Sequence, residues 1–275
     1  MLNLIEFGMK FGKKLPRSWL AKLGNSPFFS KYIEDVRKKG FDNWYQLDNN
    51  IKMYFDPTDP HLLDMIDGKD PEQKVKEIFL ENISNGDVVI DVGANIGDYT
   101  LIASKKVGIS GKVLSFEPLP ETFSILQRNL QLNEISHCLS FQKAIGEKPG
   151  MASLYKNNAS GTMGHLDSSL NGQNLIKKNE TEVVTIDEVL SSNHIENVNM
   201  IKIDVEGFEH EVLLGCLQSF KENKIKKILC EVHFEYLESK GISEKTIYDL
   251  LREHNFNITP ISDRTPSRVH ILATL

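Results

Sequence analysis

The segment Val88-Val-Ile-Asp-Val-Gly-Ala-Asn-Ile-Gly97 decides how this chain of 275 residues folds. An apolar run leads into a glycine turn, and the residues from Tyr99 to Lys106 then have the pattern of a helix. Gly93 and Gly97 would let the backbone pass close to a ligand. The N-terminus of the following helix offers unpaired N–H groups and the positive end of the helix dipole. The segment therefore predicts a nucleotide-type loop between a buried strand and a helix.

Further apolar runs along the chain repeat this pattern of a strand followed by a helix. The expected strands cover residues 87–91, 112–117, 139–141, 200–204 and 227–232, with 269–272 closing the sheet. Helical spacing of apolar side chains occurs over 73–81, Phe123 to Leu130, Leu213 to Phe220 and Ile247 to Leu251. Strands that alternate with helices are typical of an α/β fold, so we predict a doubly wound, mostly parallel, Rossmann-like sheet.

The chain before residue 73 departs from this regular alternation. Apolar side chains have helix-like spacing at Leu4, Phe7, Phe11 and Leu15. Ile51 to Phe55 alternates like a short strand and stops at Asp56-Pro57. We therefore expect a mainly helical N-terminal extension over residues 1–72, acting as a substrate or oligomerisation cap, and a main domain over 73–275.

Residues 146–199 form the irregular part of the main domain, with many asparagine, glycine and serine residues. A long connection inside a compact domain is usually functional or mobile. We interpret it as an insertion on the substrate side, and a tolerated surface hairpin is an equally open alternative. Near its end, Glu182 to Thr185 has the composition of a strand.

The composition is close to that of an average globular protein and excludes several classes. Hydrophobic residues make up 40% and charged residues 25% of the chain. The net charge of −6 gives no basis for holding a phosphate backbone, so nucleic-acid binding is not expected. No apolar run approaches the roughly 20 residues of a membrane span, and three cysteines without a C-x-x-C pair do not form a disulfide framework. We expect a cytoplasmic protein, and a homo-oligomer stays open.

Two nucleotide-type cofactors fit the glycine loop. Glu117 ends the next expected strand about twenty residues beyond Gly97, where doubly wound folds place an acid that accepts hydrogen bonds from ribose hydroxyls. A nicotinamide dinucleotide requires G-x-G-x-x-G, but Asn95 stands where the middle glycine would be. The carboxylate of Asp91 suits a cationic ligand such as S-adenosylmethionine and disfavours a pyrophosphate. A glycine-rich turn without any ligand is the third alternative.

Three motifs together resemble the FkbM-type methyltransferases, a branch of the class I S-adenosylmethionine-dependent enzymes. They are Asp91-Val-Gly-Ala-Asn-Ile-Gly97, Phe116-Glu-Pro118 and Lys202-Ile-Asp-Val-Glu-Gly-Phe-Glu209. The resemblance covers roughly residues 75–235. It implies a seven-stranded sheet, S-adenosylmethionine as the methyl donor, and O-methylation of a hydroxyl on a sugar, polyketide or related metabolite.

The resemblance also implies roles for individual residues. Gly93, Asn95 and Gly97 would surround the methionine part of the donor, Glu117 would hold its ribose, and Ala144 would lie beside its adenine. Asp204 and Glu206 would face the transferring methyl group. The expected donor site therefore comprises Asp91, Gly93, Asn95, Gly97, Glu117, Ala144 and Asp204.

Methyl transfer to a hydroxyl requires help in removing the hydroxyl proton. The candidates lie at the ends of two strands that we expect to be neighbours: Asp204, Glu206, Glu231 and His233. His233 is favoured as the general base, because an unperturbed imidazole titrates at about 6.5, with Asp204 and Glu206 as the other catalytic residues. A histidine that is only hydrogen-bonded at a strand end is the alternative.

The same four side chains could instead bind Mg²⁺ or Mn²⁺, which carboxylate oxygens and an imidazole suit. The favoured interpretation has no metal. Glu206 and Glu209 could also simply cap the helix that follows, with Glu209 to Glu211 as a solvated face.

We therefore predict an S-adenosylmethionine-dependent O-methyltransferase that acts on a small molecule or a glycan. A protein that binds the donor without catalysis is one alternative, but donor binding does not obviously need both Asp204 and Glu206. A nicotinamide-dependent oxidoreductase is another alternative, against which Asn95 argues.

Overall fold

The computed structural model describes residues 44–47, 51–54, 70–157, 164–165 and 175–275. The chain divides into two compact units, residues 1–73 and 74–275. In the first unit, β1 (Trp44–Leu47) and β2 (Ile51–Tyr54) pair antiparallel. The strand expected at 51–55 is confirmed as β2, whereas the helix expected near the N-terminus lies outside the described residues.

The second unit is built on a seven-stranded sheet with the order β12-β13-β11-β10-β3-β4-β5. Its strands are β3 (Val88–Val92), β4 (Lys112–Phe116), β5 (Cys138–Phe141), β10 (Met200–Ile203), β11 (Lys227–His233), β12 (Asn257–Pro260) and β13 (Arg268–Thr274). The five strands from β11 to β5 pair in parallel, and β13 runs antiparallel to both β11 and β12. The predicted mostly parallel sheet of seven strands is confirmed.

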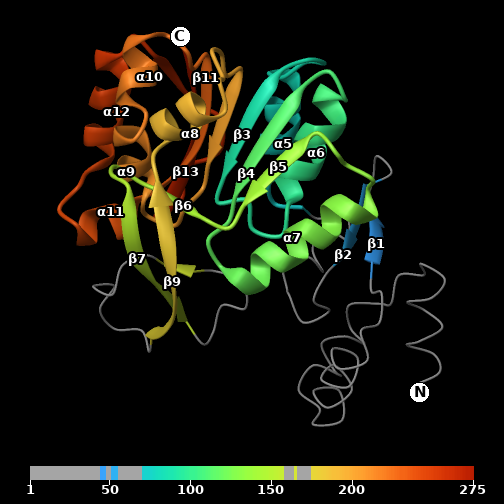
Figure 1. Ribbon diagram of the computed structural model, residues 1–275. Helices are drawn as coiled ribbons and strands as arrows, with labels where there is room; N and C mark the ends of the chain where they lie inside the picture. The colour runs from blue at the N-terminus through green and yellow to red at the C-terminus, as the bar shows by residue number, and fades with distance from the viewer. Residues whose placement is uncertain (1–43, 48–50, 55–69, 158–163, 166–174) are drawn as a thin grey trace. The chain divides into compact units, whose positions relative to one another are not determined.

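Helices cover both faces of this sheet, which Figure 1 shows as blue-green helices on one side and orange to red helices on the other. They are α5 (Gln73–Glu81), α6 (Asp98–Val107), α7 (Pro120–Leu132), α8 (Ile186–Ser192), α9 (Glu209–Leu214), α10 (Leu217–Lys221), α11 (Phe234–Ser239) and α12 (Glu244–Glu253). The single helix expected from Leu213 to Phe220 is two short helices instead. Gly215 lies between them and packs against the carbonyl oxygen of Gly146, where a Cβ would come within 2.3 Å.

Alternating side chains of each strand supply the two cores, as the pleat of a sheet requires. Val89 and Met200 pack with Phe79 of α5 on one face. Ile90 and Ile201, their neighbours along the chain, pack with the helices from α8 to α12 on the other. Both faces of the central strands are therefore buried, which explains why these strands read as continuous apolar runs.

Residues 146–199 are more regular than the sequence predicts. β7 (Gly150–Asn157) and β9 (Leu175–Val184) form a long antiparallel hairpin, which joins β6 (Ala144–Ile145) and β8 (Gly164–His165) in a second sheet of order β6-β9-β7-β8. Figure 1 shows this hairpin extending beyond the seven-stranded sheet. The strand expected at 182–185 is confirmed as the end of β9.

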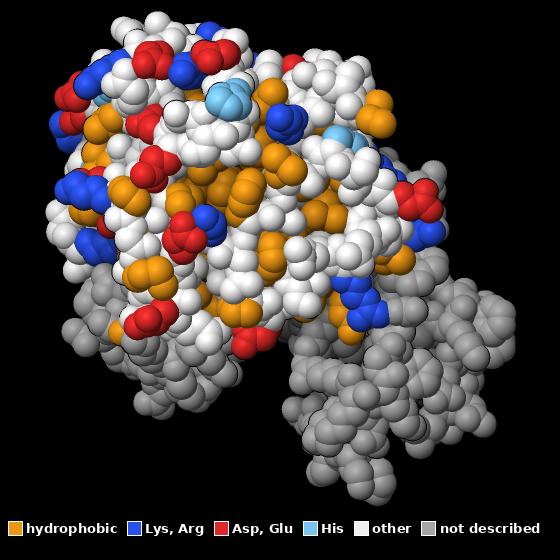
Figure 2. Space-filling model, viewed as in Figure 1, with side chains coloured by type: hydrophobic (Ala, Val, Ile, Leu, Met, Phe, Trp, Pro, Cys, Tyr) orange, Lys and Arg blue, Asp and Glu red, His pale blue; other side chains and the backbone are white. Residues whose placement is uncertain are grey.

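The surface mixes both signs of charge. Acidic and basic side chains lie interspersed on the face shown in Figure 2, and hydrophobic side chains gather toward its middle. The large hydrophobic side chains most exposed among the described residues are Ile109, Leu139, Met151 and Leu275. Scattered side chains of this kind are normal in globular proteins and mark no site by themselves. None of the described helices is long and apolar enough to cross a membrane.

Candidate active site

The candidate site lies where the strand order reverses. The chain runs outward from β3 through β4 to β5 and then returns to β10 on the other side of β3. In open α/β sheets, ligands bind at the carboxyl ends of the strands beside such a reversal. The expected neighbourhood of the strands ending near Asp204 and His233 is confirmed, because β10 and β11 pair in parallel and Ile203 lies opposite Cys230.

The glycine loop after β3 packs directly on the turn that follows β10. Gly93, Asn95 and Gly97 all have left-handed backbone conformations, with φ of 80°, 49° and 103°. A Cβ on Gly93 would lie 1.8 Å from the carbonyl oxygen of Asp204, and one on Gly97 would lie 2.7 Å from Cδ1 of Leu126. From the sequence, we expect a ligand to lie close to the backbone at Gly93 and Gly97. In the structure, the atoms that approach them belong to the protein itself.

Glu117 holds this loop in place. Its buried carboxylate accepts hydrogen bonds from the backbone N–H of Asn95 at 3.0 Å and of Leu119 at 2.9 Å. Burial raises the pKa of Glu117 to about 7 despite these two donors. Each carboxylate oxygen receives one donor and retains capacity for a second, so the side chain can still accept from a ligand hydroxyl.

Asp91 is buried at the floor of the loop with one oxygen satisfied. The hydroxyl of Thr100 donates to Oδ2 at 2.6 Å, whereas Oδ1 is buried and accepts no hydrogen bond from the described residues. The ammonium of Lys202 lies 3.8 Å from Oδ1. Burial raises the pKa of Asp91, and the Lys202 charge opposes that rise. A buried carboxylate oxygen without a donor is costly, which indicates a place for a ligand donor or cation.

Lys202 joins the two strand ends, although the sequence analysis gives it no role. Its ammonium lies 3.2 Å from Oδ2 of Asp204, 3.5 Å from the carbonyl oxygen of Gly93 and 4.8 Å from the ring centre of Tyr99. A lysine inside the buried strand β10 is itself the signal, because a buried ammonium requires partners of opposite charge.

A second group of side chains surrounds His233 at the end of β11. Its Nδ1 lies 2.8 Å from Oε1 of Glu209, and its Nε2 lies 3.5 Å from Oε2 of Glu206. One ligand atom from each of Asp204, Glu206 and His233 lies within 4.8 Å of the other two. Glu206 has a left-handed backbone with φ of 52°, which is uncommon for a residue with a side chain and often accompanies a functional site. The structure therefore brings the three predicted catalytic residues together.

Glu209 belongs to this group, and its interpretation as part of a solvated face is wrong. It is fully buried in the first turn of α9, where its Oε1 also accepts a hydrogen bond from the N–H of Gly207 at 2.9 Å. Glu209 shares the buried face of that helix with Val212 and Leu213. A carboxylate on an apolar helix face needs a buried partner, and this signal could have identified it.

The charges in this group shift the pKa values of its members. Burial lowers the pKa of His233, but the Glu209 carboxylate and the charges of Glu206 and Asp204 outweigh burial and raise it to about 10. The pKa of about 6.5 that favours His233 from the sequence therefore does not hold in this arrangement, and the role of His233 as general base stays a prediction. Burial raises the pKa of Asp204, but Lys202 and His233 outweigh it, so the net shift is downward. Burial and the Asp204 charge raise the pKa of Glu206 to about 7.

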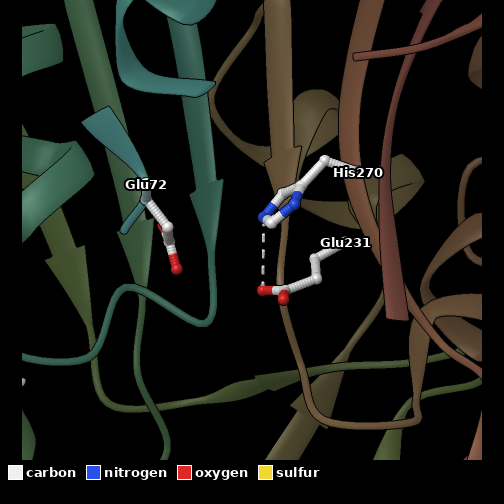
Figure 3. A group of neighbouring side chains, drawn as sticks. All are labelled: Glu72, Glu231 and His270. Atoms are coloured by element: carbon white, nitrogen blue, oxygen red, sulfur yellow. Dashed lines mark ion pairs between the residues drawn. The ribbon is translucent and has the colours of Figure 1, made fainter. Parts of the chain in front are cut away.

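Glu231 lies between His233 and the neighbouring strand β13, with its Oε1 3.8 Å from Nε2 of His233. Its carboxylate pairs with Arg268 of β13 at 2.8 Å and with His270 at 3.5 Å. Figure 3 shows the imidazole of His270 directed at this carboxylate. The group of possible ligands within 4.8 Å of one another contains Asp204, Glu206 and His233. Glu231 borders this group through His233, and its inclusion in one metal site stays a prediction.

Ala144 is buried in β6, where it pairs with Val183 of β9. It therefore lies in the smaller sheet, and its proposed place beside the adenine is an untested prediction.

Comparison with known proteins identifies the chain. The doubly wound sheet, the glycine loop after β3 and the acid after β4 occur in class I S-adenosylmethionine-dependent methyltransferases and also in other nucleotide-binding α/β proteins. Residues 91–258 match the family model described as the methyltransferase FkbM domain. The chain belongs to this family, as its sequence motifs predict.

Three related proteins illustrate the range of the family. Methyltransferase 1 of Beauveria bassiana is 30% identical over 190 residues, which cover 60% of this chain and 73% of that protein. Hexuronic acid methyltransferase AglP of Haloferax volcanii is 29% identical and covers 66% of this chain and 68% of its own. 31-O-demethyl-FK506 methyltransferase FkbM of Streptomyces tacrolimicus is 28% identical and covers 65% of this chain and 75% of its own.

Proposed function

We propose that this methyltransferase transfers the methyl group of S-adenosylmethionine to a hydroxyl oxygen of a sugar, a glycan or another small metabolite. The observation that supports the proposal is the packing of the glycine loop after β3 on the Asp204 turn after β10, next to the side chains of Glu206 and His233. The hexuronic acid methyltransferase and the 31-O-demethyl-FK506 methyltransferase among its relatives support an oxygen acceptor.

The residues of the loop fit the donor. Asp91 has a buried oxygen that accepts no hydrogen bond from the described residues, and Glu117 retains capacity to accept from hydroxyls. These carboxylates suit a ligand that carries positive charge and ribose hydroxyls, and they disfavour a pyrophosphate. S-adenosylmethionine supplies a methyl group activated by its sulfonium. Asp91, Gly93, Asn95, Gly97 and Glu117 would hold it, with Ala144 and Asp204 as further contacts.

Asp204, Glu206 and His233 act on the acceptor in this proposal. Their polar atoms converge at the carboxyl ends of β10 and β11, where they can orient a hydroxyl and receive its proton. The acceptor oxygen forms the new bond to the methyl carbon and loses its proton to this group. The electron pair of the broken carbon–sulfur bond stays on sulfur, so S-adenosylhomocysteine is the second product.

We also propose a cellular location for the enzyme and roles for residues 1–72 and for the hairpin of β7 and β9. All three cysteines are free thiols, which is consistent with the cytoplasmic location that we propose. We propose residues 1–72 as a cap that shapes the acceptor site or mediates association, because residues 1–73 form a compact unit of their own. The hairpin of β7 and β9 is proposed as an acceptor-side element. Size-exclusion chromatography with light scattering would measure the oligomeric state.

Ligand-dependent stabilisation tests the donor assignment. S-adenosylmethionine and S-adenosylhomocysteine are expected to raise the melting temperature, because a ligand at about a hundred times its Kd adds about 2.7 kcal/mol to the free energy of unfolding. NADH at the same concentration is expected to leave it unchanged. A shift with NADH alone would favour an oxidoreductase, which would overturn the donor assignment.

Transfer to a defined acceptor panel separates an enzyme from a protein that only binds the donor. The panel contains uronic-acid glycosides, neutral sugars and a hydroxylated polyketide. Formation of S-adenosylhomocysteine in step with a methylated acceptor is expected. Tight binding of S-adenosylhomocysteine without any transfer would favour the non-catalytic alternative.

A further inference from the structure

We propose that Asp204, Glu206 and His233 form a binding site for one divalent cation, Mg²⁺ or Mn²⁺, on the acceptor side of the active site. The role of the ion rests on the proposed function, whereas the existence of the site rests on geometry alone. One ligand atom from each residue lies within 4.8 Å of the other two, a spacing that lets a single ion contact all three.

A buried nitrogen without a partner points into this group. The side chain of His233 is 6% exposed, and its Nε2 is buried and has no hydrogen-bond partner among the described residues. That atom lies 3.5 Å from Oε2 of Glu206, which is a separation that two ligands of one ion can have. An imidazole nitrogen left without a donor or acceptor in a buried place is costly unless something else binds it.

Glu209 fixes the imidazole in the orientation that metal-binding histidines have. Its Oε1 lies 2.8 Å from Nδ1 of His233 and is itself held by the N–H of Gly207. Ligating histidines almost always donate their second ring N–H to a carboxylate, a carbonyl or water. An ion at Nε2 of His233 takes the place of the proton on that nitrogen, so metal binding competes with protonation of the imidazole. The fully buried carboxylate of Glu209 therefore orients the imidazole of His233 in addition to accepting the N–H of Gly207.

The chemical types of the three proposed ligands select the kind of ion. Two carboxylates and one imidazole suit Mg²⁺ or Mn²⁺, whereas soft ions prefer thiolates. Three protein ligands leave further coordination positions for water and for the acceptor. Glu231 Oε1 also lies 3.8 Å from Nε2 of His233. We leave Glu231 out of the set because its carboxylate already pairs with Arg268 and His270 of β13. Such an ion is a Lewis acid at the acceptor side, where it favours loss of the hydroxyl proton.

Binding of Mn²⁺ to the full chain without donor or acceptor tests the site directly. The electron paramagnetic resonance signal of free Mn²⁺ falls as the ion binds, so a titration gives the affinity. Asp204→Asn and His233→Gln are each expected to weaken Mn²⁺ binding at least about tenfold, and Glu209→Gln by about 10–100-fold because it acts through the imidazole. Competition by Mg²⁺ is expected to restore the free Mn²⁺ signal.

A matched control comes from the same helix. Glu211→Gln also removes one negative charge from α9, but Glu211 pairs with Lys240 and is not one of the three ligands. Its Mn²⁺ affinity is expected to equal that of the unmodified protein. Glu206→Gln provides a second ligand variant with a lower risk of misfolding, because the Glu206 side chain is 20% exposed. Circular dichroism checks the fold of each variant.

Two results would overturn the inference. One is that the amplitude of the free Mn²⁺ signal does not fall when the unmodified protein is added. The other is that Glu211→Gln and Glu209→Gln weaken Mn²⁺ binding to the same extent. Binding of S-adenosylhomocysteine, measured by calorimetry in EDTA, reports separately on the donor site. Methyl transfer that continues unchanged in EDTA would refute the catalytic role of the ion and leave the proposed function standing.

Discussion

Gly93→Ala is expected to weaken binding of S-adenosylhomocysteine by about 100-fold, because misplacement of a binding element by about 1 Å can have an effect of that size. Gly93 has φ of 80°, and a Cβ there would lie 1.8 Å from the carbonyl oxygen of Asp204. The obstacle is backbone and cannot rotate away, so the loop has to move off the end of β10. Isothermal titration calorimetry of the folded variant measures this loss.

Gly241→Ala is the matched control for this prediction. Gly241 also has a left-handed backbone, with φ of 71°, but nothing lies within 4 Å of the Cβ position. The substitution therefore adds the strain of about 1–2 kcal/mol that a side chain causes in this conformation, without a collision. Its donor affinity is expected to be unchanged. A folded Gly93→Ala protein with normal affinity would remove the glycine loop from the donor site.

Lys202→Met is expected to lower the free energy of unfolding by about 3–5 kcal/mol, the usual effect of removing one partner of a buried ion pair. Methionine keeps most of the volume of the side chain, but Asp91 and Asp204 lose the cation that lies between them. Urea unfolding followed by circular dichroism measures the change. Adding Asp91→Asn to this variant is expected to recover part of the lost stability, because it removes one of the two uncompensated charges.

Lys245→Met is the control for the loss of a lysine charge. Lys245 is 80% exposed and pairs with Asp249 along α12. Exposed pairs of this kind contribute little, so the change is expected to stay within about 0.5 kcal/mol. A similarly small effect of Lys202→Met would show that the cation does not hold the ends of β3 and β10 together.

The sequence predicts the central sheet well because its strands are buried on both faces. Val88–Val92 and Met200–Ile203 are short apolar runs bounded by turns, a pattern that depends only on local composition. The edge strand Asn257–Pro260 was missed because it is mostly exposed and carries a proline. The sequence does not predict β7 or the first part of β9, because Asn, Lys and Glu residues hide their alternation, and pairing between the two strands stabilises them instead.

Two kinds of feature that the sequence analysis does not use are visible in the sequence: a capping box and charged residues within apolar segments. Thr185-Ile-Asp-Glu188 is a capping box, with both reciprocal hydrogen bonds formed at the start of α8. The charged side chains of Lys202 and Glu209 interrupt apolar patterns and require buried partners. Their partners could not be predicted from spacing, because they depend on strand order and on which side of β11 each side chain faces.

The geometry around His233 shows the limit of sequence reasoning most clearly. The residue types correctly indicated a polar group at the ends of two neighbouring strands. The pKa of His233 depends on carboxylates from the turn after β10 and from α9, at distances that only the fold sets. The left-handed conformation of Glu206 is equally unpredictable, since glutamate rarely adopts it.

Transfer of a deuterated methyl group tests the central claim most directly. The full chain is incubated with S-adenosylmethionine labelled as CD₃ and with the acceptor panel described above, and the products are located by mass spectrometry and NMR. The account predicts a CD₃ group on a hydroxyl oxygen of one acceptor class, with one S-adenosylhomocysteine formed for each group transferred. Label on a nitrogen or carbon atom, or donor binding without transfer to any acceptor, would contradict it.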